Sequence, residues 1–282
     1  MGYLNHKSIK DVFLDLKNYS DKKIFKNKLI SEKLEELLED YEKTLEINLD
    51  HKKIFLKDLY NQTLENTKNK QITTFNLKEF TEKLIMYQNK KNFKINTGIF
   101  ISCILKNLVY KPERIDLDFT RLRIKIDYLG YKNENLNFSI RGNLGDRSFN
   151  YAKNINARIN GNIENYAFYN CENSTFNVLG NVACYGAQEI KDSKIKVLRN
   201  VKNHFGVKSS NSIFEINGNI DNHSFNDAKK IQATIKGDVK NNLAKNCIDS
   251  KIYIRTDKKI KFKEIGKGTT IYNKGIPILL ID

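Results

Sequence analysis

The chain has 282 residues, with 49 Lys and Arg against 33 Asp and Glu, so its formal net charge is +16. Hydrophobic residues make up 40% of it, which is enough for a packed core and excludes wholesale disorder. The longest apolar run, Gly98 to Leu105, has eight residues, so no membrane span is expected. Because the polar start, Met1 to Lys10, lacks the apolar segment of a secretory signal, we expect a cytoplasmic protein.

Residues 1–110 have the patterns of a helical domain. Ser8–Asp11 and Asn76–Glu79 each have the form of a capping box and predict two helix starts. Between them, the apolar residues from Leu29 to Tyr41 recur at helical spacing opposite a charged face. Ile54 to Leu64 predicts another helix. Ile99 to Leu108 is so apolar that we expect this last helix to be buried.

After Pro112 the apolar residues alternate with polar ones, which is typical of strands. Ile115, Leu117 and Phe119 predict one strand, and Leu122 to Tyr128 predicts a second. We assign residues 111–136 as strands that connect the helical domain to the next part of the chain.

From Asn137 onward the sequence repeats every 19 residues, in six uninterrupted copies and a seventh that degrades after Asp257. In each copy the second, fourth and eighth positions are apolar or Ala, the sixth is nearly always Gly, and the seventh is Asn or Asp. The first copy, for example, has Phe138, Ile140, Gly142, Asn143 and Leu144 at these five positions. Such a period is typical of a solenoid in which each copy forms one coil.

The repeat predicts a parallel β-helix, or β-solenoid, with coils of 19 residues stacked about 4.8 Å apart. A strand ends at each Gly, and Gly-Asn turns the corner because both residues tolerate positive φ. The Asn residues would form a ladder, and positions 13 and 16, such as Phe149 and Ala152, would complete the core. The predicted fold class is thus α+β, with a helical domain at 1–110, connecting strands at 111–136, the β-solenoid at 137–257 and a C-terminal cap at 258–282. In that cap, the apolar Ile276 to Ile281 would cover the last coil or form an oligomer contact.

Gly142-Asn-Leu-Gly-Asp146, followed by Ile159-Asn-Gly-Asn162 and its successors, resembles the GXGXG family. That domain is a right-handed β-helix, found at the C-terminal end of the large chain of glutamate synthase and in one of the chains of formylmethanofuran dehydrogenase. The resemblance covers Asn137 to about Asp257. It implies a spacer that holds parts of a larger enzyme together, and it carries over no catalytic residue.

The four cysteines have no CxxC spacing, and Cys171 and Cys247 would lie four coils apart, too far for a disulfide. We expect them to be core thiols. The carboxylates form no acid–base pair, and no nucleotide, dinucleotide or hydrolase motif is present. We therefore predict no catalytic residue, no cofactor and no metal, although the sequence leaves open whether the protein is an enzyme.

Position 11 of successive coils holds Tyr166, Tyr185, His204 and His223, which should stack about 5 Å apart. Two stacked imidazoles can bind a metal, but zinc sites normally have three or more protein ligands. An exposed aromatic ladder that stabilises neighbouring coils is the favoured interpretation.

We expect a non-catalytic scaffold or protein-interaction module, with a protein partner or a second copy of the chain and no membrane. The alternative is a nucleic-acid or other polyanion binding protein that uses basic faces. Residues 137–282 carry 23 basic and 13 acidic side chains. This charge favours the alternative only where it converges on one face of the rod.

Overall fold

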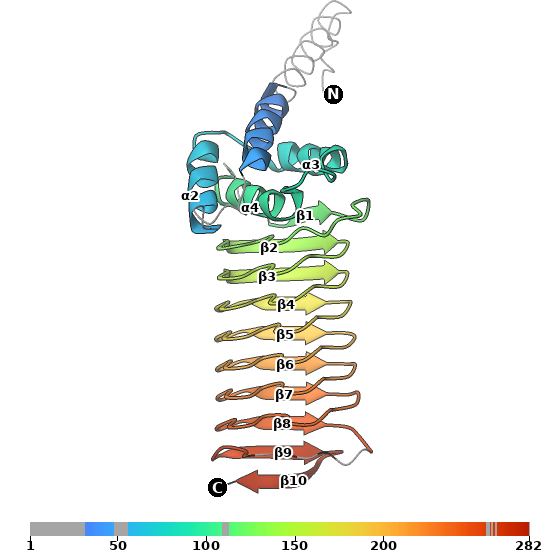
Figure 1. The fold of residues 1–282 in the computed structure, drawn as a ribbon. Coiled ribbons are helices and arrows are strands. Elements are labelled where there is room, and N and C mark those ends of the chain that lie inside the picture. Colours follow the sequence, from blue (N-terminus) through green and yellow to red (C-terminus); the bar gives the residue numbers. More distant parts are fainter. Residues whose placement is uncertain are drawn as a thin grey trace, which may run out of the picture.

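The computed structural model describes residues 32–47, 56–108, 113–257, 260, 262 and 264–281, which form a helical cap on one end of a long rod (Figure 1). The helices are one over residues 32–46, α2 (Leu56–Thr67), α3 (Thr74–Lys83), the short 3-10 helix η1 (Leu84–Met86) and α4 (Phe93–Lys106). The predicted α+β class is confirmed. None of the helices in the described part combines the length and apolar character that a membrane crossing requires.

The helical cap follows most of the predicted pattern. Leu37 and Tyr41 from the predicted stripe are buried, and α4 is almost wholly buried, as expected. The predicted start at Asn76 is wrong by three residues, because Thr73 is the N-cap of α3 and Asn76 is the third residue of its first turn. The Thr73 hydroxyl and the Asn76 side chain cap each other's backbone N–H groups, as in a capping box. The other predicted box, Ser8–Asp11, lies outside the described residues.

Helix α4 fixes the cap to the first coil of the rod. Gly98 packs so closely that a Cβ there would lie 1.7 Å from the carbonyl oxygen of Asp127. The Ser102 hydroxyl donates to the carbonyl of Gly98, and the Asn133 amide donates to the carbonyl of Ser102 at 2.8 Å. Asp127 is buried and ion-paired with Lys94, and burial raises the pKa of its carboxyl to about 6. The cap is therefore a fixed end piece of the rod.

The rod is one ten-stranded sheet in chain order, in which the first nine strands are parallel. The strands are β1 (Ile115–Asp118), β2 (Glu134–Arg141), β3 (Lys153–Asn160), β4 (Thr175–Val178), β5 (Lys194–Val197), β6 (Ile213–Ile216), β7 (Gln232–Ile235), β8 (Lys251–Ile254), β9 (Thr269–Asn273) and β10 (Ile276–Ile281). From β2 to β9, each paired residue of one strand lies opposite the residue 19 positions later in the next strand. The predicted β-solenoid is therefore confirmed.

The regular register runs beyond the predicted end of the repeat at Asp257, because Lys251 still pairs with Thr270. After β9 the chain reverses at Lys274-Gly275, and β10 pairs antiparallel with β9. The apolar tail thus forms the last strand of the sheet.

The first coil is larger than the others and corrects one predicted strand. Ile115 pairs with Phe138, 23 residues later, whereas Asp127 bonds to the backbone of Asp146, 19 residues later. Four extra residues therefore lie between β1 and Asp127, and this segment forms an irregular loop in place of the strand predicted over Leu122 to Tyr128. The alternating apolar residues of this loop still contact the core: Ile126 is buried, and Leu122 and Ile124 pack against the core while partly exposed.

The Gly-Asn corners work differently from the prediction. Among the corner glycines only Gly142 has positive φ, and the Asn residues that follow do not. Glycine is favoured because successive coils touch at this point: a Cβ on Gly180 would lie 2.3 Å from the carbonyl oxygen of Gly161. The predicted Asn ladder is present, and each Asn Oδ1 accepts the next coil's backbone N–H, as from Asn162 to Asn143 at 2.8 Å.

The tight bends lie elsewhere in each coil. In one coil Tyr166, Phe168, Asn170 and Asn173 have φ between 48° and 63°, and the same positions recur with positive φ in the other coils. Such φ values are rare for residues other than glycine and are held here by the bonds to the coils on both sides.

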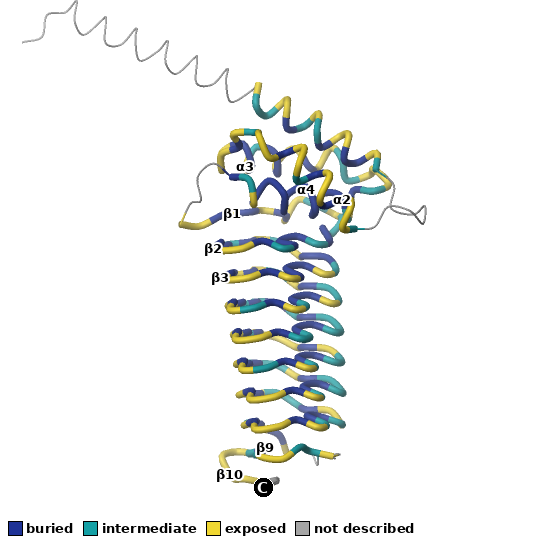
Figure 2. Tube along the Cα trace, turned by 90° about the vertical axis from the view of Figure 1, so that its left-hand side faces the viewer, coloured by how far each residue is buried: buried dark blue, intermediate teal, exposed yellow. Residues whose placement is uncertain are grey.

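The core lies inside the coils, and exposed residues follow the outer edges (Figure 2). Positions 13 and 16 are buried as predicted, with Phe149, Phe168, Ala152 and Cys171 all at most 1% exposed. Position 13 holds Phe in some coils and Ala or Gly in others: a Cβ on Gly206 would lie 2.6 Å from the ring of Phe225 in the next coil. The ring of one coil thus fills the space that a small residue leaves in its neighbour.

We predict that Gly180→Ala lowers the free energy of unfolding by about 1–3 kcal/mol, because the added methyl group overlaps the Gly161 carbonyl. Urea unfolding followed by circular dichroism measures the change. Arg199→Ala is the matched control, since Arg199 occupies the same position of the next coil and already carries a Cβ. Equal stability of Gly180→Ala and the wild type would contradict this account of the corner.

Candidate functional site

Three features carry functional groups: the aromatic ladder, the outer face of the strands, and a cleft where this face meets α3.

The four predicted ladder residues lie in one column on successive coils. Tyr166 and Tyr185 stack with ring centroids 4.8 Å apart, Tyr185 and His204 at 4.8 Å, and His204 and His223 at 5.0 Å. The planes of neighbouring rings lie within 9° of each other. The guanidinium of Arg147 caps this stack, 5.1 Å from the centroid of Tyr166. The geometry is that of a stacked ladder closed by a cation–π contact.

The ladder has the means to stabilise the rod but lacks a ligand set for a metal. Within the described ranges no group of three or more His, Cys, Asp or Glu side chains is placed to hold a metal ion. Partial burial, together with the neighbouring His223, lowers the pKa of His204. The neutral imidazole is therefore the form that the stacked column favours.

All four cysteines are free. Cys103, Cys171 and Cys247 are buried, and Cys184 is half-buried. Burial raises the pKa of the Cys171 thiol to about 12 and that of the Cys247 thiol to about 11. The three buried thiols lie in the core, as predicted, whereas the predicted core position is wrong for Cys184, which is only partly buried.

The outer face of the strands carries the excess charge of the solenoid. We define the strand face as the outward first, third and fifth positions of the coils from Asn137 to Asp257. It holds seven basic side chains and one acidic one, namely Arg141, Arg158, Lys194, Lys196, Lys236, Lys251, Arg255 and Glu215. The whole segment has 17 basic and 11 acidic residues, so all other positions carry ten of each sign. The net charge of +6 therefore lies on one face.

Some of these cations are held by ion pairs. Glu215 pairs with Lys194 at 2.6 Å and with Lys196 at 3.4 Å, and these lysines hold the pKa of the Glu215 carboxyl below its ordinary value. Arg141 pairs with Asp118 of β1 at 2.8 Å. No ion pair within the described residues involves the other four, Arg158, Lys236, Lys251 and Arg255, all of which are exposed.

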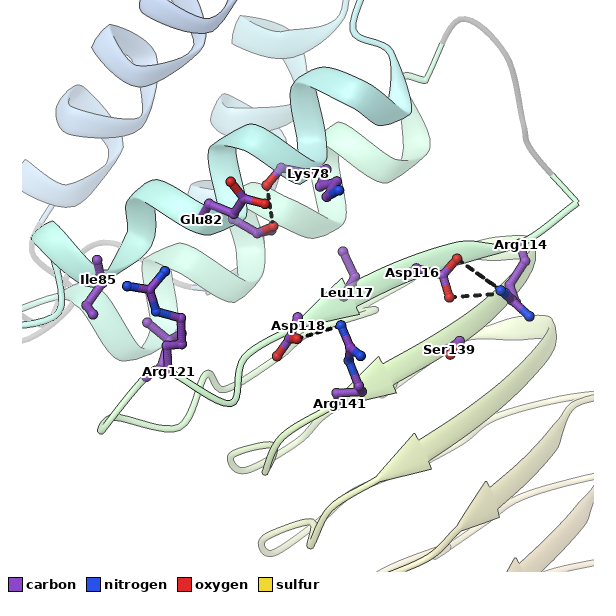
Figure 3. A pocket seen from close by; sticks show the side chains of 12 residues that line it. Lys78, Glu82, Ile85, Arg114, Asp116, Leu117, Asp118, Arg121, Ser139 and Arg141 are labelled. Carbon is purple, nitrogen blue, oxygen red and sulfur yellow. Dashed lines mark hydrogen bonds and ion pairs between the residues drawn. The ribbon is translucent and has the colours of Figure 1, made fainter.

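A cleft of about 660 Å³ lies at the N-terminal end of the strand face, between α3 and the strands β1 and β2 (Figure 3). We call it the α3 cleft. Its lining is Lys78, Thr81, Glu82, Ile85, Arg114, Asp116, Leu117, Asp118, Arg121, Leu122, Ser139 and Arg141. The volume is within the range of small-molecule sites, and the lining combines charged side chains with an apolar floor.

Two of the cleft's carboxylates are already satisfied. Asp118 accepts hydrogen bonds from the backbone and hydroxyl of Thr120 and pairs with Arg141, which together lower the pKa of its carboxyl. Asp116 pairs with Arg114 at 3.1 Å. These pairs fix both arginines at the edge of the cleft.

Sequence reasoning missed this cleft. Arg121 reaches it from the enlarged loop of the first coil, and Lys78 reaches it from a helix about forty residues earlier. The only indication in the sequence is the spacing: residues 127–136 follow the pattern of residues 146–155 at a distance of 19, and residues before 119 do not.

Comparison of the chain with protein-family models, with curated proteins and with solved structures finds no significant match to any of them.

We predict that protonation of His204 lowers the free energy of unfolding as the pH drops below about 7. The pKa of His204 is lower in the folded chain than its ordinary value of about 6.5, so the unfolded chain binds more protons in this range. The loss is largest where both forms are protonated.

His204→Asn should remove that loss. Asn already occupies the equivalent position of a later coil, at Asn242. Urea unfolding at pH 7.5 and 5.5 measures it as the difference between wild type and variant. Asp127 acts oppositely between about pH 6 and pH 4, because its folded-state pKa is raised, but it cancels in this difference. The same pH dependence in both proteins would refute the assignment.

Proposed function

We propose that the protein binds nucleic acid through the strand face, without reading its sequence. The observation that carries this proposal is the position of the solenoid's charge: the net +6 of residues 137–257 lies on the strand face, while the other positions of these coils are balanced. Phosphate contacts from Lys and Arg dominate non-specific binding to nucleic acid. Sequence readout would require groove-shaped elements or base-edge contacts, which a flat face of exposed cations does not provide.

The dimensions of the face agree with a short strand. From Arg141 on β2 to Lys251 on β8 there are six coil steps, or about 29 Å at about 4.8 Å per step. At the rise of about 3.4 Å per nucleotide that a fully stacked strand has in B-form geometry, eight or nine nucleotides would lie along it. Tyr253 and Tyr272, stacked on each other 4.8 Å apart, add an aromatic pair at the far end of the same face.

Binding should weaken as the salt concentration rises, and the steepness of this dependence should report how many cations contact phosphate groups. Each phosphate neutralised on a single strand contributes about −0.7 to the slope of log affinity against log salt. We expect a slope of about −3 if only the four cations without an ion pair act, and about −5 if all seven do. Fluorescence anisotropy with a labelled ten-nucleotide single strand, titrated between about 50 and 200 mM salt, gives the slope.

The triple variant Arg158→Gln, Lys236→Gln and Lys251→Gln should reduce the slope by about 2 units. A matched triple, Lys202→Gln, Lys208→Gln and Lys229→Gln, removes the same charge from exposed positions on the other faces. Its slope should remain close to that of the wild type. Equal effects of the two triples would mean that binding follows net charge alone, and absence of binding at low salt would refute the proposal.

A second candidate function is the scaffold predicted from the sequence, now as self-association at the end of the rod. The observation that favours it is the exposed apolar surface of β10, the last strand of the sheet, where Ile276 is 67% exposed and Ile278 47%. Apolar side chains on an edge strand favour pairing with another chain.

We expect sedimentation velocity to show a concentration-dependent dimer that the double variant Ile276→Lys and Ile278→Lys abolishes. Phe75→Lys with Met86→Lys, two exposed apolar residues on the helical cap, is the control and should leave the dimer intact. A wild-type protein that remains monomeric at about 100 μM would rule out a dimer with a dissociation constant at or below that concentration.

A further inference from the structure

The α3 cleft occupies the position where a strand lying on the strand face would end. Arg141 belongs to both features, because it is the first basic residue of the strand face and also lines the cleft. Beyond it, α3 lies across the end of the sheet, above β1 (Figure 3). A polyanion that follows the strand face toward the cap therefore meets a closed end.

The cleft is built by a departure from the repeat. The first coil has four more residues than the regular 19, and the enlarged loop brings Arg121 and Leu122 to the cleft. Insertions in repeat proteins commonly lie on the binding face. The backbone N–H of Arg123 donates to the side chain of Gln88 at 3.0 Å, which ties this loop to the helical cap and fixes its position.

The charges in the cleft are arranged to receive an anion. Arg114 and Arg141 are already oriented by Asp116 and Asp118. Lys78 lines the cleft from α3 and Arg121 from the enlarged loop, and within the described residues neither forms an ion pair with a carboxylate. Glu82 is the remaining acidic side chain of the lining, and it opposes an anion there.

We propose that the α3 cleft binds the terminal phosphate of a nucleic-acid strand whose remaining phosphates lie along the strand face; this inference rests on the proposed function. A terminal phosphate is a monoester with a charge of about −1.5 to −2 at pH 7, whereas each internal phosphate carries one negative charge. A closed end with two further cations therefore favours the terminal group over an internal one.

The test compares three internally labelled ten-nucleotide single strands, with a 5′-phosphate, a 3′-phosphate or no terminal phosphate, by fluorescence anisotropy at constant salt. We expect one of the two terminal phosphates to tighten binding about five- to tenfold, in line with charge-assisted hydrogen bonds at a partly exposed site. Arg121→Gln should abolish this preference. Glu82→Gln should increase it, because the opposing carboxylate is removed.

Arg123→Gln is the matched control, since this residue lies in the same loop but not in the cleft, and the variant should keep the full preference. Binding of all three strands with equal affinity would overturn the inference and leave the proposed function standing. Failure of every strand to bind at low salt would overturn both. A preference that survives Arg121→Gln would also overturn the assignment to this cleft.

Discussion

The structure depends on the bonding of each residue to the residue 19 positions along the chain. Backbone hydrogen bonds connect the coils on all sides, and side chains extend them at several columns. Asn Oδ1 atoms accept the next backbone N–H at one corner, as between Asn143 and Asn162. Buried Ser hydroxyls accept the N–H of the preceding coil, as between Ser174 and Ser193. Because a coil of this kind satisfies its polar groups only through its neighbours, one coil has no stability of its own.

The same constraint explains where function can reside. Inward positions are filled by the core, and the corner and bend positions are occupied by Asn ladders, glycines and residues with positive φ. The outward positions of the strands are the part of each coil that is free to vary without disturbing the stack. The excess of basic residues is found there, which separates it from the balanced charge pairs elsewhere, such as Lys153 with Glu172.

The sequence was sufficient to predict the features that repeat. The 19-residue period, the inward columns, the Asn ladder and the stacked column from Tyr166 to His223 all follow from comparing equivalent positions. Features that occur once were not predictable in this way. The N-cap at Thr73 depends on a single reciprocal pair of hydrogen bonds with Asn76, and the last strand β10 depends on a single turn that pairs it with β9. The enlarged loop around Arg121 depends on a contact with the distant helical cap, from Arg123 to Gln88.

The turn chemistry was predicted wrongly for a related reason. From its sequence context Gly180 is expected to have positive φ, whereas in the structure its lack of a Cβ leaves room for the Gly161 carbonyl of the preceding coil, a contact that no single coil reveals. Conversely Phe168 has positive φ, which its own propensity disfavours, because the neighbouring coils determine its backbone.

The unequal size of core residues at equivalent positions has a consequence for folding. Similar 19-residue units with the same hydrogen-bonding positions allow a folding error in which the chain skips a coil and still satisfies the backbone ladders. Skipping residues 213–231 would remove Phe225, whose ring packs against Gly206, and would bring Ala244 to its place. The empty space would cost about 3–5 kcal/mol, as for other losses of a buried Phe side chain. The uneven core thus enforces the correct order of coils, which the hydrogen bonds alone cannot distinguish.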